Sequence, residues 1–222
     1  HGNNFIRMQG RNVNVNRLLL NNKIYGVTKG QYSPTSDRGA VTKSSPYGTV
    51  EDPFIPAELT FGARGHFFAR AIDVDLEVSK ECMIAAGRHK GASVVEILQN
   101  CVIFNDKIHS YVADREFRAD RTIHLRQGEK MLFGKNMDKG LVLDGYKLKA
   151  VTVGENGVTI DDILTHDPTT ANDIMHQILA MMDGHSLPLA VGVIRNVEPP
   201  TYDPDVQAQL HALRSHTPNP TL

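Results

Sequence analysis

Residues 21–36 read NNKIYGVTKGQYSPTS and follow directly on an apolar run at residues 18–20. The alternating residues before that run, together with its three leucines, predict a buried strand that ends at Asn21. A polar stretch with two glycines and a proline comes after the asparagine pair. Ligands of an α/β sheet gather at the carboxyl ends of its strands, where the connecting loops open. The paired amides therefore stand where a ligand would be expected to bind.

The chemistry of the amide pair is compatible with two interpretations. The side chain of Asn22 offers a neutral oxygen, and the backbone carbonyl of Ile24 can point the same way. A hard Mg²⁺ ion takes oxygen ligands and is held by few protein groups together with phosphates, and Gly26 would let a cofactor approach the backbone closely. Asparagine is also a common turn residue, and the dipeptide by itself favours a simple turn.

Composition narrows the class of protein. The chain has 222 residues, enough for one large domain or two small ones, and 41% of them are hydrophobic. Its 24 basic and 25 acidic residues give a net charge of −1, so no strong field indicates nucleic acid or an anionic membrane as a partner. We find no apolar run of the roughly 18–20 residues that a membrane span needs, and no signal-peptide pattern. Two cysteines are too few for a disulfide framework, which favours the reducing cytoplasm.

The first half of the chain alternates between helical and strand patterns. We expect a short helix over residues 1–10, a long ordered loop over 26–57, a helix and turn over 57–65, a strand over 66–73, a helix over 76–89 and a strand over 92–98. The helix over 76–89 carries Val78, Cys82 and Ala86 on one face. This alternation predicts an α/β fold with a parallel sheet flanked by helices.

The composition changes after residue 106, and charged residues are frequent over residues 114–130. We expect the later elements to be strands within 130–134 and 141–153, an amphipathic helix over 170–182 and a last strand over 189–197. The polar tail that follows is expected to wrap a neighbour or fray. The stretch 167–173 resembles a helix N-cap. We therefore divide the chain into an α/β part, residues 1–106, and a C-terminal extension, residues 107–222.

The longer string around the amide pair is more specific than the dipeptide. NNKIYGVTKGQYSPTS resembles the second half of the thiamine-diphosphate motif in the β subunits of 2-oxoacid:ferredoxin oxidoreductases. The resemblance continues in RNVNVNRLLLNN upstream, in ASVVEILQNCVIFND at 92–106 and in VGVIRNVEPPTYD near the C-terminus, so that it covers most of the chain. The form TKGQYSPTS is most similar to the 2-oxoglutarate enzyme.

This resemblance implies roles for five residues of the loop. Asn22 through its side chain and Ile24 through its carbonyl would bind the Mg²⁺ that holds the diphosphate. Gly26 and Val27 would line the thiamine diphosphate, although many relatives carry leucine where Val27 stands. Lys29 would favour an anionic 2-oxoacid substrate; the alternative for Lys29 is a solvated loop lysine.

The cysteines and the first residues indicate whether this chain holds the whole of the family's cofactor and cluster sites. In the resembled family the cysteine at Cys101 is the fourth thiolate of a [4Fe–4S] cluster, whereas composition alone favours a small buried hydrophobe there. Cys82 is expected in the core, so this chain lacks the remaining cluster ligands and also the upstream Gly-Asp-Gly of the motif. We therefore expect the C-terminal portion of a longer subunit. The opening HGNN departs from the family's usual GGNH, which argues against a catalytic role for His1.

The implied activity is the oxidative decarboxylation of 2-oxoglutarate with coenzyme A and thiamine diphosphate, with electrons passing through the cluster to ferredoxin. The partner α subunit supplies the glutamate that activates the cofactor, so no catalytic residue is assigned to this chain. The scattered histidines show no metal-binding spacing. Two alternatives remain open: a non-redox thiamine-diphosphate decarboxylase or synthase, and a truncated, non-catalytic interaction subunit.

Overall fold

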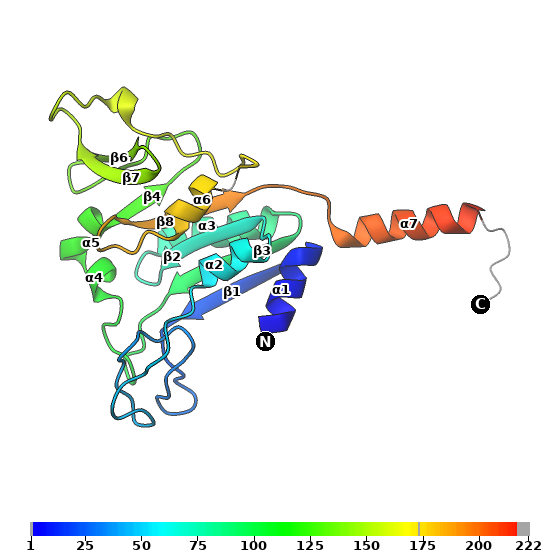
Figure 1. The fold of residues 1–222 in the computed structure, drawn as a ribbon, viewed down its shortest axis with the longest axis horizontal. Helices are drawn as coiled ribbons and strands as arrows, with labels where there is room; N and C mark the ends of the chain where they lie inside the picture. The colour runs from blue at the N-terminus through cyan, green and yellow to red at the C-terminus, as the bar shows by residue number, and fades with distance from the viewer. Residues whose placement is uncertain (1, 173, 217–222) are drawn as a thin grey trace.

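A computed structural model describes residues 2–172 and 174–216 of the chain. Its main sheet has the strand order β1-β3-β2-β8-β4 (Figure 1). The strands are β1 (Val15–Asn21), β3 (Ala92–Leu98), β2 (Phe67–Ile72), β8 (Leu189–Asn196) and β4 (Thr122–Leu125). β1, β3 and β2 run parallel, β8 is antiparallel to β2, and β4 is parallel to β8. The predicted α/β fold with a mostly parallel sheet is confirmed, with one antiparallel pairing.

Burial differs sharply between the central strands and β1. All residues of β2 and β3 are buried, as is usual for parallel strands covered on both faces. In β1, Leu18 and Leu20 are 50% and 56% exposed, because the strand lies at the edge of the sheet. The strand over these residues is therefore present as predicted, but the prediction that it is buried was wrong.

Helices cover both faces of the sheet. On one face α1 (Gly2–Arg11), α2 (Pro56–Gly62) and α6 (Ile174–Ala180) contribute to a core that includes Phe5, Phe61 and Leu179. On the other face α3 (Leu76–Arg88) buries Val78, Cys82 and Ala86 against the strands, as its apolar spacing predicts. The side chain of Asp75 caps α3 by accepting a hydrogen bond from the Val78 N–H.

The second half of the chain extends this sheet and adds a smaller one. The short helices α4 (Ser110–Ala113) and α5 (Arg115–Arg121) lead into β4, and the smaller sheet is made of β5 (Leu132–Phe133), β6 (Lys139–Asp144) and β7 (Lys147–Thr152), followed by the turn η1 (Ile160–Asp162). Two strands of the main sheet thus come from beyond residue 106. The division of roles at that residue stays a prediction.

Two expectations for this half need correction or restriction. The charged stretch 114–130 contains α5 and β4, which its composition did not indicate. The helix expected over 170–182 is shorter, Ile174–Ala180, and Asp173, at the end of the expected cap, lies outside the described residues. His1 lies outside them as well.

The tail forms a helix rather than an irregular segment. α7 (Tyr202–His216) extends away from the rest of the molecule in Figure 1. At its base the Arg11 guanidinium lies 5.3 Å from the centre of the Tyr202 ring, and Asn12 Nδ2 donates to the Pro200 carbonyl at 3.0 Å. Across the described ranges, no helix combines the length and the hydrophobicity that crossing a bilayer requires.

Candidate functional site

The amide pair lies at the carboxyl edge of the main sheet. Asn21 is the last residue of β1 and pairs in register with Leu98, the last residue of β3. Immediately after it, Asn22 Oδ1 accepts a hydrogen bond from the Ile24 N–H at 3.2 Å, which closes a tight turn. An amide oxygen has two lone pairs, so this bond leaves Asn22 able to bind a cation too.

A cavity of about 620 Å³ opens beside this turn. Asn22, Ile24, Gly26 and Val27, which were predicted to bind the cofactor and its metal, all line it. The donor set suits Mg²⁺, because a side-chain amide oxygen and a backbone carbonyl are hard, neutral ligands. The size of the cavity and the absence of a side chain at Gly26 suit a cofactor that must approach the backbone. The structure thus brings these four residues together.

Lys29 belongs to the same loop but does not line the cavity. Its side chain is exposed, and its backbone adopts a left-handed conformation with φ of 67°. Its N–H donates to the Gly26 carbonyl at 3.0 Å, which fixes the turn that carries both residues. The predicted contact of Lys29 with a substrate stays a prediction.

The loop that carries Cys101 packs directly against the amide loop, and Figure 1 shows the loops after β1 and β3 together at one edge of the sheet. A Cβ atom added to Gly26 would lie 3.7 Å from Cys101 Sγ. Gly30 is pressed still more closely, since a Cβ there would lie 2.9 Å from Cδ1 of Phe104. Cys101, predicted to bind iron, therefore lies on a loop next to the one that carries the residues predicted to bind the cofactor, but it does not line the 620 Å³ cavity.

Asn105 joins the two loops, and sequence reasoning missed it. Its Nδ2 donates to the Asn22 carbonyl at 3.0 Å and approaches the Lys23 carbonyl at 3.4 Å. Asn105 and Phe104 both belong to the string VIFND, which follows Cys101. That string is a signal of the site, but no local pattern indicates which loop its side chains would contact.

A buried charged pair beneath the amide turn was also missed. Glu96 of β3 accepts from Asn21 Nδ2 at 2.9 Å and from Arg70 Nε of β2 at 2.8 Å. The side chains of Arg70 and Glu96 are 5% and 3% exposed. Their signal in the sequence is a charge in the middle of an apolar strand, since such residues are rarely buried unless they are paired.

The two cysteines have different surroundings. Cys82 is fully buried in the core beneath α3, and burial raises the pKa of its thiol to about 12. Its Sγ lies 3.6 Å from the Arg70 carbonyl, and it is a neutral structural residue, as predicted. Cys101 is a free thiol, half-buried at the carboxyl edge.

His109 is a further buried polar residue at this edge. Its Nε2 lies 2.9 Å from the Asn21 carbonyl, and because a carbonyl can only accept, this nitrogen carries the proton. Burial lowers the pKa of His109, which favours the neutral ring. Among residues 2–172 and 174–216, no group of three or more His, Cys, Asp and Glu side chains is arranged to hold a metal ion.

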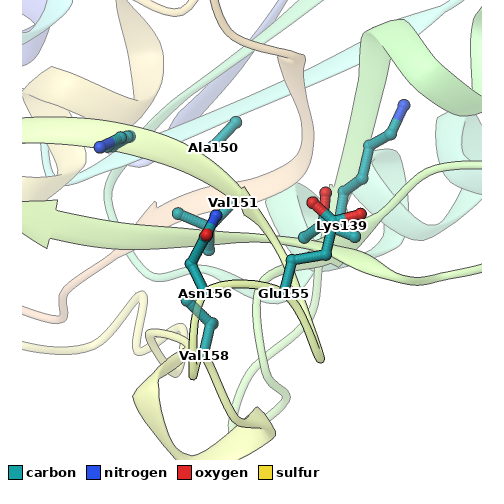
Figure 2. A pocket seen from close by; sticks show the side chains of 8 residues that line it. Lys139, Ala150, Val151, Glu155, Asn156 and Val158 are labelled. Atoms are coloured by element: carbon teal, nitrogen blue, oxygen red, sulfur yellow. The ribbon is translucent and has the colours of Figure 1, made fainter.

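A second hollow of about 350 Å³ lies on the three-stranded sheet. Figure 2 shows Lys139, Glu155 and Asn156 around it, with Val151 and Val158. The Lys139 ammonium is paired at 2.7 Å with the Asp120 carboxylate. None of the residues predicted to bind a ligand lies in this hollow.

Comparisons with known proteins indicate the family of the chain. The family model "Thiamine pyrophosphate enzyme, C-terminal TPP binding domain" matches residues 1–97. The chain is 40% identical over 221 residues to the 2-oxoglutarate oxidoreductase subunit KorB of Mycobacterium tuberculosis, covering 99% of this chain and 58% of that protein. It is 40% identical over 121 residues to the β subunit of 2-oxoacid:ferredoxin oxidoreductase 1 of Aeropyrum pernix, covering 54% of this chain and 36% of that protein.

A solved structure shares the fold. The 2-oxoglutarate:ferredoxin oxidoreductase of Magnetococcus marinus, solved with 2-oxoglutarate, coenzyme A and succinyl-CoA bound, superposes with a TM-score of 0.64 at 23% identity. The match covers 99% of this chain and 58% of that one, so the chain spans somewhat more than half the length of such proteins. Over nearly its whole length, the chain is a homologue of the KorB β subunits of 2-oxoglutarate oxidoreductases.

Proposed function

We propose that this chain is the β-subunit portion of an enzyme that oxidatively decarboxylates 2-oxoglutarate with coenzyme A and passes the electrons to ferredoxin. The enzyme works with an α subunit in the cytoplasm and uses thiamine diphosphate, Mg²⁺ and a [4Fe–4S] cluster. The observation that carries the proposal is the contact between the amide loop and the Cys101 loop, where Asn105 Nδ2 donates to the Asn22 carbonyl at 3.0 Å and a Cβ added to Gly26 would lie 3.7 Å from Cys101 Sγ. A redox thiamine enzyme needs its cofactor and its cluster close together, and a non-redox one does not.

The amide turn would hold the metal and the cofactor. Asn22 Oδ1 and the Ile24 carbonyl would bind Mg²⁺, which in turn neutralises the diphosphate. Gly26 and Val27 would line the bound cofactor in the 620 Å³ cavity. When bound, thiamine diphosphate supplies the carbanion chemistry of decarboxylation, so the protein contributes binding and orientation.

Cys101 would take part in electron transfer, and Lys29 would bind the substrate. Cys101 would be one cluster thiolate, and the other three would come from outside these 222 residues, since the remaining cysteine, Cys82, is buried in the core. Lys29, an exposed residue of the amide loop, would attract a carboxylate of the 2-oxoacid. The group that activates the cofactor would belong to the α subunit.

The test uses the full-length β subunit assembled with its α subunit. We expect reduction of ferredoxin that requires 2-oxoglutarate, coenzyme A and thiamine diphosphate together, and iron and sulfide in the purified complex. Release of CO₂ without iron or ferredoxin reduction would indicate a non-redox decarboxylase or synthase instead. A complex that binds no thiamine diphosphate would indicate a non-catalytic interaction subunit.

A further inference from the structure

A buried ion pair lies directly beneath the turn that presents Asn22. Arg70 and Glu96 face each other in register on β2 and β3, with Arg70 Nε 2.8 Å from Glu96 Oε2. Arg70 Nη2 also donates to the Ala180 carbonyl at 3.0 Å. Removing two charges from water is costly, and one frequent reason for keeping such a pair is that it fixes the geometry of its neighbours.

The Glu96 carboxylate determines how the Asn21 amide is oriented. An ionised carboxylate can only accept hydrogen bonds, so the NH₂ group of Asn21 must face Glu96 Oε1, which lies 2.9 Å away. Asn21 Oδ1 therefore points away from Glu96. It accepts hydrogen bonds from Thr35 Oγ1 at 2.8 Å and from the Lys23 N–H at 3.3 Å.

These bonds connect the amide turn to residues 33–36. Ser36 Oγ donates to the Lys23 carbonyl at 2.6 Å, and the Ser33 N–H donates to Ser36 Oγ at 2.8 Å. Lys23 lies between Asn22 and Ile24 and is held through both its N–H and its carbonyl. The positions of the two oxygens assigned to the metal thus depend on bonds that begin at Glu96.

We propose that Glu96, with Arg70 as its counter-charge, is a positioning residue that sets the affinity of the Asn22–Ile24 turn for Mg²⁺ and thiamine diphosphate by fixing the orientation of Asn21. Neither Glu96 nor Arg70 lines the 620 Å³ cavity beside the turn. The inference rests on the proposed function, because it takes the turn to be the metal site. Outer partners of metal ligands affect affinity by about 10–100-fold when they are changed.

The variant Glu96→Gln tests the orienting role. Glutamine has the same shape, but Arg70 Nε can only donate, so the glutamine oxygen must face Arg70 and its NH₂ group must face Asn21, where it opposes the present orientation of the amide. We expect the Kd for Mg²⁺, titrated calorimetrically into the full-length complex with thiamine diphosphate present, to rise about tenfold. Saturating Mg²⁺ should restore turnover, since the chemistry itself is untouched.

Thr35→Val is a milder test of the same network, because it removes the hydrogen bond from Thr35 Oγ1 to Asn21 Oδ1 and leaves Glu96 unchanged. Two further variants serve as controls. Thr122 is a half-buried threonine of β4 whose Oγ1 donates to the Arg118 carbonyl at 2.7 Å, so Thr122→Val removes a comparable bond outside the network. Val78→Ala destabilises the core beneath α3 without touching the loop. We expect a rise in Kd, smaller than that of Glu96→Gln, for Thr35→Val and no change for either control.

The outcomes separate this inference from the proposed function. If Glu96→Gln and Thr35→Val bind Mg²⁺ like the wild type while Asn22→Ala loses binding, the positioning role is wrong and the metal site stands. If Asn22→Ala also binds normally, the metal site itself is wrong. If Glu96→Gln does not assemble, the comparison of Thr35→Val with Thr122→Val decides, and equal Kd values for that pair would overturn the inference.

Discussion

The carboxyl edge of the main sheet and the three-stranded sheet both carry a hollow, but only the first has converging polar groups. At the carboxyl edge, Asn105 bonds to the carbonyl of Asn22, a residue 83 positions away, and Asn21 bonds to Glu96, 75 positions away. At the three-stranded sheet the ion pair of Lys139 with Asp120 joins residues 19 positions apart on an exposed surface. The two hollows therefore differ most clearly in the long-range polar contacts beside them.

The physical reason is the direction of the strands. Parallel strands end at the same edge, so residues far apart in the chain meet there and their loops can share a ligand. β6 and β7 are antiparallel neighbours joined by a short turn, and they contribute Leu141 and Leu148 to the core. Substitutions at the carboxyl edge should therefore change ligand binding, and substitutions in the small sheet should change only the stability of the fold.

The largest expected effect belongs to Cys101→Ala. A cubane cluster needs four ligands, and removing one thiolate should abolish the intact cluster in the full-length subunit. Iron content and the broad visible absorbance should fall, and ferredoxin reduction should fail, while thiamine diphosphate still binds. Analysis of iron and sulfide, together with the visible spectrum, measures this directly.

Cys82→Ala is the control within the same chain. It removes a buried sulfur from the core and should cost about 1 kcal/mol or somewhat more of unfolding free energy, without loss of iron. Full iron content and normal electron transfer in the Cys101 variant would remove the main residue-level support for the redox function.

Asn22→Ala should have the next largest effect. It removes one of the two oxygens assigned to Mg²⁺, and because even an outer partner of a metal ligand contributes about tenfold to affinity, the loss should be at least that large. Titration calorimetry with thiamine diphosphate and Mg²⁺ on the intact complex measures it. Glu155→Gln, in the hollow of the three-stranded sheet, is a control at the other hollow and should leave the affinity unaltered.

The elements with clear local patterns could be predicted from the sequence. The apolar spacing of α3 and the mainly apolar run of β3 place both elements, and the amide loop is marked by its sequence NNKIYGVTKGQYSPTS. β4 was missed because it is four residues long, lies in a charged stretch and buries only alternate residues. The half-exposed face of β1 was missed because an apolar run reads the same in an edge strand as in a central one.

The polar contacts of the site were harder to predict than its residues. The string around Cys101 indicated a second functional loop, but the bond from Asn105 to Asn22 depends on how two loops pack, and no periodicity encodes that. Glu96 and Arg70 were visible as charges in apolar strands. Their pairing follows only from the register of β2 with β3, which the sequence alone leaves open.

Gly30→Ala tests how tightly the two loops of the carboxyl edge are packed. Gly30 has a φ of +93°, and an added Cβ would lie 2.9 Å from the Phe104 ring. Gly39, in the same long loop, has a φ of +84° and nothing within 4 Å of such a Cβ. Gly39→Ala should therefore cost about 1 kcal/mol for the backbone conformation alone, and Gly30→Ala about 1–3 kcal/mol more.

Denaturant unfolding of the full-length subunit measures the two variants side by side. The difference between them isolates the contact with Phe104, since the backbone strain is common to both. Equal destabilisation would mean that the Cys101 loop yields to the added methyl group, and that the two loops are not held rigidly together.

The smallest expected effect is that of Lys29→Met. Lysine and methionine are both unbranched at Cβ, so the left-handed backbone at this position, with φ of 67°, is strained about equally by either and the change isolates the charge. An exposed ion pair contributes about 0.2–1 kcal/mol, which corresponds to a rise in KM for 2-oxoglutarate of roughly two- to fivefold with little change in kcat. The rise should shrink with added salt, because exposed charges are screened. Lys149→Met, in the hollow of the three-stranded sheet, should leave KM unchanged. An equal rise for monocarboxylic 2-oxoacids would place Lys29 at the carboxylate that all these substrates share, and an unchanged KM at low salt would make it a solvated loop lysine.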